Sequence, residues 1–187
     1  MMEERDYAGC CGLYCGLCPR FQSTSASRCL GCQLGEQHSY CSVWRCCVKK
    51  YGFHTCAECT EFPCERLLKV IGVGVDSFIS HQPALPNLER IRQAGEESHL
   101  AEQRERRLLL EDLLARYNEG RSMSFYCTAC TLMPVHLLRQ ALGEMEDAVS
   151  RGQVPEADIK AKAKTMRSLL LELARQAGVD LTLRKGP

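Results

Sequence analysis

Three short stretches decide how this chain can fold: residues 11–19 read CGLYCGLCP, residues 29–32 read CLGC and residues 56–64 read CAECTEFPC. Each stretch contains a C-x2-C pair. A gap of two residues lets both thiolates of a pair turn toward one ion, and two pairs complete a tetrahedral site of four sulfurs. The pattern predicts a small, irregular, metal-stabilised cysteine-rich module of the zinc-knuckle or ribbon type.

The number of cysteines and their location favour metal ions over disulfides. The chain has 187 residues and 14 cysteines, and twelve of the cysteines lie in residues 1–64. The first six residues, MMEERD, are acidic and lack the apolar segment of a secretion signal. We therefore expect a cytoplasmic protein, in which thiols stay reduced and dense cysteines usually bind metal.

The two halves of the chain differ in composition. Residues 1–64 contain six Leu and Val residues and no Ile, too few to offset an ordering cost of about 1.5 kcal/mol per residue. A structural zinc ion contributes about 10–16 kcal/mol of folding free energy. Residues 65–187 are rich in leucine. We expect a cysteine-rich metal-binding module over residues 8–64, packed on a mainly α-helical region over residues 65–187.

The spacing of the cysteines predicts about two zinc ions. The first ligand set is Cys15, Cys18, Cys29 and Cys32. The second set is Cys47, Cys56, Cys59 and Cys64, with Cys11 and Cys41 as the first replacements. Adjacent cysteines point in different directions, and we expect Cys11 and Cys47 to bind metal more often than Cys10 and Cys46. His38 and His54 could replace a thiolate, although exposed loop histidines are the simpler interpretation.

An iron–sulfur protein in electron transfer or redox catalysis is the alternative, because four thiolates also hold a [4Fe–4S] cluster. Cys11, Cys15 and Cys18 have the spacing of radical S-adenosylmethionine enzymes. We interpret that match as accidental, because no strand precedes it as the barrel of those enzymes requires. A third hypothesis is metal handling or thiol redox chemistry by the remaining cysteines. Cys127 and Cys130 are interpreted as two small buried residues of a helix rather than as a redox pair.

Apolar periodicity predicts helices in the second half, over residues 65–71, 87–92, 98–118, from about 128 or 132 to 142, and 155–177. Residues 122–126 and 179–183 are expected to be extended. Lys160, Lys162 and Lys164 alternate on the polar side of the last helix, which indicates a solvated face.

The net charge of the chain and its motifs limit the classes of function that we expect for it. The net charge of +1 gives no overall attraction to nucleic acid or to an anionic membrane. No apolar run approaches the roughly 18 residues of a membrane span. We expect another protein as the partner, and no nucleic acid or membrane. Because no catalytic set of side chains can be inferred, we expect a binding or adaptor role rather than an enzyme, and we assign no reaction.

The cysteine pattern resembles a known family. Residues 11–19, the pair at 29–32 and the closing CAECTEFPCERL at 56–67 are similar to the cysteine-rich prokaryotic family called domain of unknown function 3795. The resemblance covers about residues 8–118. It implies a zinc or other metal site in a prokaryotic cytosol, and no established reaction. Members often have a further cysteine near Val43 or Trp44, and its absence here leaves the second ligand set open.

Overall fold

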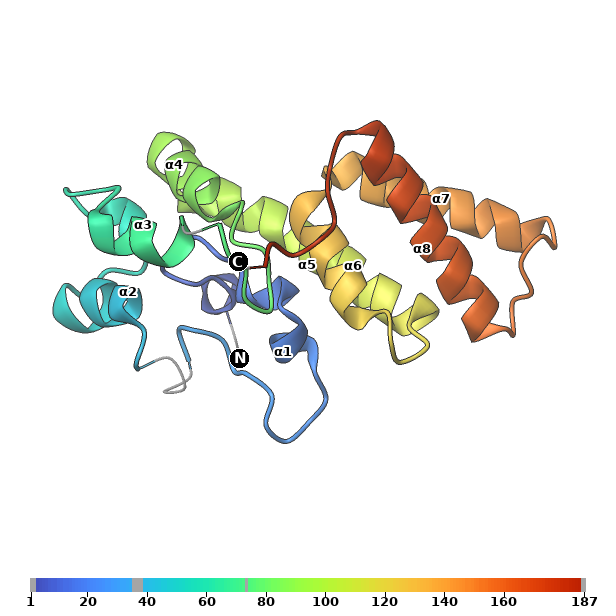
Figure 1. The fold of residues 1–187 in the computed structure, drawn as a ribbon, viewed down its shortest axis with the longest axis horizontal. Helices are drawn as coiled ribbons and strands as arrows, with labels where there is room; N and C mark the ends of the chain where they lie inside the picture. Colours follow the sequence, from blue (N-terminus) through green and yellow to red (C-terminus); the bar gives the residue numbers. More distant parts are fainter. Residues whose placement is uncertain (1–2, 35–38, 73, 186–187) are drawn as a thin grey trace. The chain divides into compact units, whose positions relative to one another are not determined.

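The chain folds into helices and short helical turns joined by loops (Figure 1). The computed structural model describes residues 3–34, 39–72 and 74–185. Within these ranges no β-strand forms, and an isolated bridge joins Ala8 to Tyr14. Two parts of the predicted fold class are thus confirmed: the protein is mainly helical, and its cysteines cluster in the N-terminal region.

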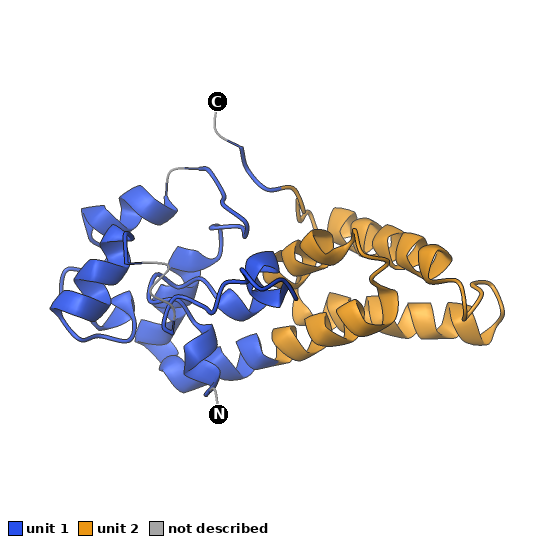
Figure 2. Ribbon diagram, turned by 90° about the horizontal axis from the view of Figure 1, so that it is seen from below, with its two compact units in different colours: residues 1–104, 183–187 blue, residues 105–182 orange. Residues whose placement is uncertain are grey.

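The chain is divided into two compact units (Figure 2). Unit 1 comprises residues 1–104 and 183–187, and unit 2 comprises residues 105–182. Unit 1 contains η1 (Glu4–Tyr7), η2 (Cys15–Leu17), α1 (Pro19–Gln22), α2 (Ser42–Trp44), the π-helix η4 (Arg45–Lys50), η5 (Cys56–Glu58), α3 (Glu65–Ile71), α4 (Ala84–Ala94) and the start of α5 (Glu96–Tyr117). Unit 2 contains the rest of α5, α6 (Met123–Leu132), α7 (Val135–Ser150) and α8 (Ile159–Gln176).

Two of the C-x2-C pairs form single turns of 3-10 helix. Cys15 begins η2, and the N–H of Cys18 donates to the carbonyl of Cys15 at 2.9 Å. Cys56 begins η5, and the N–H of Cys59 donates to the carbonyl of Cys56 at 3.2 Å. A tight turn of this kind keeps the two thiols of a pair close to each other, as a knuckle requires.

The core of unit 1 contains cysteines as well as aliphatic side chains. Its buried members are Cys10, Val43, Trp44, Cys47, Cys56, Ala57, Leu67, Ile71, Ala84 and Leu88. Leu67 and Ile71 come from α3, whose predicted bounds of 65–71 are confirmed. Ala84 and Leu88 come from α4, which begins three residues before the predicted Asn87. Unit 1 therefore extends beyond residue 64, and the module boundary at that residue stays a prediction.

The first knuckle lies against α4 with no space between their backbones. Gly12 has a φ of +86°, and a Cβ atom at this position would lie 2.2 Å from the carbonyl oxygen of Ala84. The side-chain amide of Asn87 donates to the Gly12 carbonyl at 2.9 Å. The close approach to Ala84 needs a residue without a side chain, so Gly12 allows the cysteine segment to pack on α4.

A buried carboxylate holds the end of the chain to unit 1. The side chain of Asp76 is 0% exposed and accepts from the Arg184 guanidinium at 2.8 Å and from the Arg184 N–H at 2.8 Å. The N–H of His81 donates to the same carboxylate at 2.8 Å. Burial opposes ionisation, but the hydrogen bonds from Arg184 and His81 outweigh it and lower the pKa of Asp76 to about 2.

We expect Asp76→Asn to release the C-terminal residues at neutral pH. The loss of charge-assisted hydrogen bonds should cost about 2 kcal/mol, and amide exchange at Arg184 should become at least tenfold faster. In the native chain, protection should be complete above the ordinary Asp pKa, because the folded state has the lower pKa, and should disappear as the pH falls toward 2. Asp180→Asn is the control, because Asp180 bonds locally to Thr182. Equal exchange in both variants would contradict the role of Asp76.

Unit 2 corrects two of the secondary-structure predictions. Residues 122–126 are not extended, because α6 begins at Met123 and buries Tyr126, whose hydroxyl donates to the Tyr117 carbonyl at 3.0 Å. Residues 179–183 form no strand, and the N–H of Val179 instead closes the end of α8 by donating to Ala174 at 2.8 Å. In residues 122–126 the hydrogen bonds of α6 replace the expected extended backbone.

The other helices of unit 2 agree with the predictions except at their ends. α7 begins after Pro134 and continues through Gly143 to Ser150, beyond the expected end at Leu142. α8 begins at Ile159 rather than at residue 155, because the Asp158 carboxylate accepts from the N–H groups of Lys160 and Ala161 and caps the helix there. The apolar residues predicted to pack along this helix are Ile159, Ala163, Met166, Leu170, Leu173 and Ala177. The middle four are buried, whereas Ile159 and Ala177 at the ends are exposed.

In the described part of the chain, no helix combines the length and the apolar character needed to cross a membrane.

Candidate metal centre

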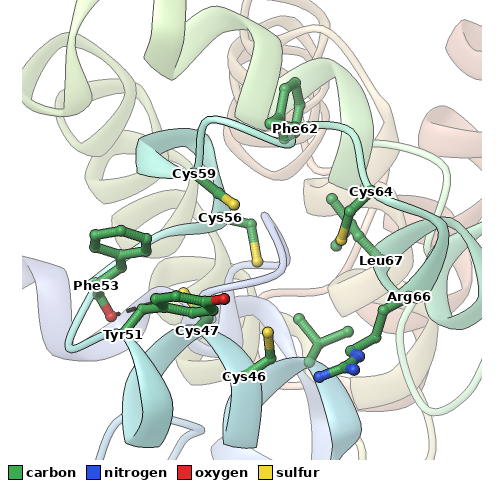
Figure 3. Close-up of a pocket in the computed structure, with 11 residues that line it drawn as sticks. Cys46, Cys47, Tyr51, Phe53, Cys56, Cys59, Phe62, Cys64, Arg66 and Leu67 are labelled. Carbon is green, nitrogen blue, oxygen red and sulfur yellow. Dashed lines mark hydrogen bonds between the residues drawn. The ribbon is translucent and has the colours of Figure 1, made fainter.

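Five cysteines line one pocket in unit 1 (Figure 3). They are Cys46, Cys47, Cys56, Cys59 and Cys64. The pocket has a volume of about 30 Å³, and its other walls are mainly apolar and aromatic, with Arg66 as the charged residue among the lining side chains. Figure 3 shows the sulfurs of Cys46, Cys56 and Cys59 turned toward the space between η4 and η5. All four members of the second predicted ligand set therefore share this pocket.

Three sulfurs lie especially close together. The Sγ atoms of Cys10, Cys47 and Cys56 are all within 4.8 Å of one another, and all three residues are buried. Within the described ranges, these residues form the group of three or more Cys, His, Asp or Glu side chains whose ligand atoms lie this close together. Sulfurs bound to one tetrahedral zinc ion lie about 3.8 Å apart, since each Zn–S bond is about 2.3 Å. The three sulfurs fit a metal ion after a small inward movement.

Backbone contacts bring these three residues together from distant parts of the sequence. The N–H of Cys56 donates to the carbonyl of Cys10 at 2.9 Å, which joins the first and last cysteine segments. The Sγ of Cys47 lies 3.7 Å from the carbonyl oxygen of Phe53 (Figure 3). η4 supplies Cys47, and the loop after η4 turns back so that η5 can supply Cys56.

A capping box fixes the start of η5 and so the position of Cys56. The Glu58 carboxylate accepts from the N–H groups of His54 and Thr55, both at 2.8 Å. The Thr55 hydroxyl accepts from the N–H of Ala57 at 3.3 Å. These bonds satisfy the exposed donors at the start of the turn and hold the knuckle before any metal binds.

The three sulfurs share their protons unevenly. Hydrogen bonds from the thiols of Cys10 and Cys56 lower the pKa of Cys47 to about 5. The bonds with Cys47 and Cys56, together with burial, raise the pKa of Cys10. For Cys56 the bond with Cys10 lowers the pKa, but the bond with Cys47 and burial outweigh it and raise the pKa to about 12. Three thiolates at this distance need a cation, because their mutual repulsion otherwise keeps protons on two of them.

The first predicted ligand set also shows contacts typical of thiolate ligands. The N–H of Cys32 donates to the Sγ of Cys15 at 3.5 Å, and the N–H of Gly31 donates to the Sγ of Cys29 at 3.4 Å. A hydrogen bond from the Cys32 thiol lowers the pKa of Cys15, and the same bond raises the pKa of Cys32. Burial raises the pKa of Cys18, against N–H groups of Arg20 and Phe21 that lower it. These four cysteines face one another less closely than the group of three, and their ligation stays a prediction.

Cys11, one of the two proposed replacements, lies between the two sets. Burial raises the pKa of the Cys11 thiol to about 12. The hydrogen bond from the Leu13 N–H lowers this pKa, whereas the charges of Cys15, Cys41 and Cys56 raise it further. A Cβ atom at Gly9 would lie 3.6 Å from the Sγ of Cys11 and 3.8 Å from that of Cys15, which shows that these two thiols are close to each other. The prediction of Cys11 and Cys41 as replacement ligands of the second set stays a prediction.

Cys10 belongs to this group of three, although the sequence prediction placed it in neither ligand set. Its neighbour Cys11 has the regular spacing, and no local signal distinguishes Cys10. The contact that selects it is the long-range hydrogen bond to Cys56. Of the histidines, His54 is exposed, as expected for a loop residue, and its carbonyl accepts from Gln33 at 3.0 Å. His38 lies outside the described residues.

The remaining C-x2-C pair lies in the core of unit 2. Cys127 is 1% exposed and Cys130 is 0% exposed, both on α6. Burial raises the pKa of Cys130 to about 12. A thiol that stays protonated and inaccessible is a poor nucleophile, and the interpretation of this pair as small core residues agrees with its environment.

The comparison with known proteins agrees with the cysteine pattern. Residues 7–69 match a protein family of unknown function, DUF3795. This confirms the resemblance predicted from the sequence, although over a shorter range than residues 8–118. The DUF3795 segment begins before Cys10 and ends within α3, so it includes every cysteine of the pocket and of both predicted ligand sets. No curated protein and no solved structure matches the chain.

Proposed function

We propose that this chain is a zinc-binding protein in which thiolates of unit 1 hold the ion and so stabilise the fold. The observation that carries the proposal is the convergence of Cys10, Cys47 and Cys56 within 4.8 Å in a buried core. Cys59 and Cys64 line the same pocket and supply candidates for the fourth ligand. A second ion at Cys15, Cys18, Cys29 and Cys32 completes the proposal, with about two zinc ions per chain.

The surroundings of the pocket favour a structural role for the ion. Its lining offers several sulfurs and mainly apolar walls, and a site with four thiolate ligands leaves no position for water or substrate. A closed site of this kind contributes folding free energy rather than catalysis. Unit 1 needs that contribution, because three of the ten buried side chains in the cluster around the site are the thiols themselves.

A [4Fe–4S] cluster is the second candidate, and one observation favours it. The pocket contains five cysteines, and four thiolates are enough to hold such a cluster. Buried thiolates with apolar walls also suit an iron–sulfur cluster. The two proposals share the same ligands and differ in the metal.

Metal analysis of protein purified without oxygen tests the proposal. Elemental analysis should find about two zinc ions per chain, and the ultraviolet–visible spectrum should have no band near 400 nm. Iron with an equal amount of sulfide and a broad band near 400 nm would replace zinc with the iron–sulfur proposal. A chain free of both metals, with full stability in a chelator, would contradict metal binding altogether.

We also propose that the protein acts in the cytoplasm as a binding or adaptor protein whose partner is another protein. Exposed apolar side chains in the cysteine-rich segment, such as Leu30, Leu34 and Tyr40, support this choice of partner. The balanced charge of the chain supports it as well, because nucleic acid binding usually needs a basic surface. Turnover of a substrate by the metal-loaded protein would contradict a purely adaptor role.

A further inference from the structure

Unit 2 contains a basic cleft far larger than the cysteine pocket. Its volume is about 520 Å³, within the range of roughly 300–1,000 Å³ that small-molecule sites occupy. Seven residues line it: Glu119, Arg121, Ser122, Lys160, Ala163, Lys164 and Arg167. Four of the seven are cations and one is a carboxylate, which gives the lining a formal charge of +3. The whole chain has a net charge of only +1, so the positive charge is concentrated here.

The cations of the cleft are available to a ligand. Arg121, Lys160 and Lys164 are exposed, and none of them has an ion-pair partner among the residues that the structure describes. Arg167 lies over the ring of Phe125 at 4.1 Å, a contact that leaves its charge uncompensated. By contrast, Arg107, Arg116, Arg139 and Arg175 elsewhere in unit 2 pair with carboxylates. Four unpaired cations around one cleft repel one another unless an anion lies between them.

Rigid contacts define the shape of the cleft. One wall is the loop between α5 and α6, and the other is the first half of α8. The Arg167–Phe125 contact joins α8 to α6, and the Nζ of Lys162 lies 5.7 Å from the ring centre of Tyr117, which joins α8 to α5. Ser122, which precedes α6, donates to Glu119 at 2.9 Å and does not cap the helix. The positive end of the α6 dipole therefore adds to the field of the cations.

Glu119 is the carboxylate among the residues that line the cleft. One oxygen of its carboxylate accepts from Ser122, and the other, Oε2, is buried without a hydrogen bond. An acceptor buried this completely does not face the open cleft, so Glu119 contributes its charge while the four cations determine the ligand. An anionic ligand would satisfy those cations.

We infer that the cleft binds a small phosphorylated molecule. Its phosphate groups would lie between the side chains of Arg121, Lys160, Lys164 and Arg167. The size of the cleft favours a small molecule over a nucleic acid, which would need a basic surface that continues beyond the cleft. The binding site is independent of the metal centre, because all of its residues lie in unit 2.

Pyrophosphate is the probe, titrated calorimetrically into the full metal-loaded chain in 50 mM and 300 mM salt. We expect binding that weakens with salt, because exposed charges are screened. Lys164→Gln should weaken binding about fivefold and Lys160→Gln/Lys164→Gln at least tenfold, as charge-assisted contacts are lost. Both lysines are exposed, so circular dichroism should show an unchanged fold. Lys162→Gln is the matched control on the same helix, because Lys162 does not line the cleft.

Three outcomes would overturn the inference. The first is a wild-type chain that does not bind pyrophosphate. The second is equal affinity in the wild type, Lys164→Gln and Lys162→Gln. In that case pyrophosphate would be bound at the metal centre and not in the cleft. The third is a single-stranded oligonucleotide that binds more tightly than pyrophosphate and loses its affinity in the double lysine variant, which would assign the cleft to nucleic acid.

Discussion

Replacing Cys56 with serine should remove metal from the cysteine pocket and unfold unit 1. Cys56 lies within 4.8 Å of both Cys10 and Cys47, and its N–H bonds to Cys10, so the variant loses a central ligand. If a four-thiolate zinc site contributes about 10–16 kcal/mol, the loss of one ligand should cost roughly 3 kcal/mol or more. The zinc content should fall by about one ion per chain.

The single tryptophan of the chain reports on this unfolding. Trp44 is 8% exposed and belongs to the same core as the three cysteines. Its emission should shift to longer wavelength in Cys56→Ser, and in the wild type when a chelator is added. Cys127→Ala serves as the control, because this buried thiol lies in unit 2 and should leave the zinc content unchanged. Full zinc content in Cys56→Ser would show that Cys56 is not a ligand.

Gly12→Ala should destabilise unit 1 by about 4 kcal/mol. The left-handed backbone of Gly12 alone costs an alanine about 1–2 kcal/mol. The new Cβ would lie 2.2 Å from the Ala84 carbonyl oxygen and 2.8 Å from the Cγ of Leu88. The first atom belongs to the backbone of α4 and cannot move aside by a side-chain rotation, so overpacking adds a cost of similar size or larger. Denaturant unfolding followed by Trp44 fluorescence measures the change.

Gly52→Ala separates backbone strain from the steric clash. Gly52 also has a positive φ, +68°, but nothing lies within 4 Å of a Cβ atom placed there. This variant should lose only the 1–2 kcal/mol of backbone strain. If both variants lost the same stability, the close packing of Gly12 on α4 would not be important for the fold.

The spacing of residues along the chain was sufficient to predict the local features. The C-x2-C pairs at Cys15 and Cys56 form 3-10 turns because a hydrogen bond across three residues closes them. α3 has the predicted bounds because Glu65 and Gly72 mark its two ends. The apolar residues of α8 predicted which of its sides is buried. In each case the interacting groups are within one or two turns of one another, so the sequence specifies the interaction.

The secondary-structure predictions were wrong where the same residues could form either a helix or an extended segment. The aromatic pair Phe125–Tyr126 favours strands by composition, yet α6 includes it, because Tyr126 can then reach the Tyr117 carbonyl from a buried position. Tertiary burial outweighs an intrinsic preference that is worth about 1 kcal/mol. The segment after Gly178 had no neighbouring strand to pair with in the described chain, so its weak alternation of apolar residues had no effect.

The sequence by itself determined that thiols are concentrated near the N-terminus, that they occur in knuckle pairs, and that the rest of the chain is helical. Only the tertiary structure decided that Cys10 joins Cys47 and Cys56, because that choice depends on a backbone hydrogen bond between residues 46 positions apart. It likewise decided that Lys160 and Lys164 line a cleft with Arg121, although their spacing predicted a simple solvated face. Spacing fixes which side chains share a turn or a helix face, whereas packing fixes which distant faces meet.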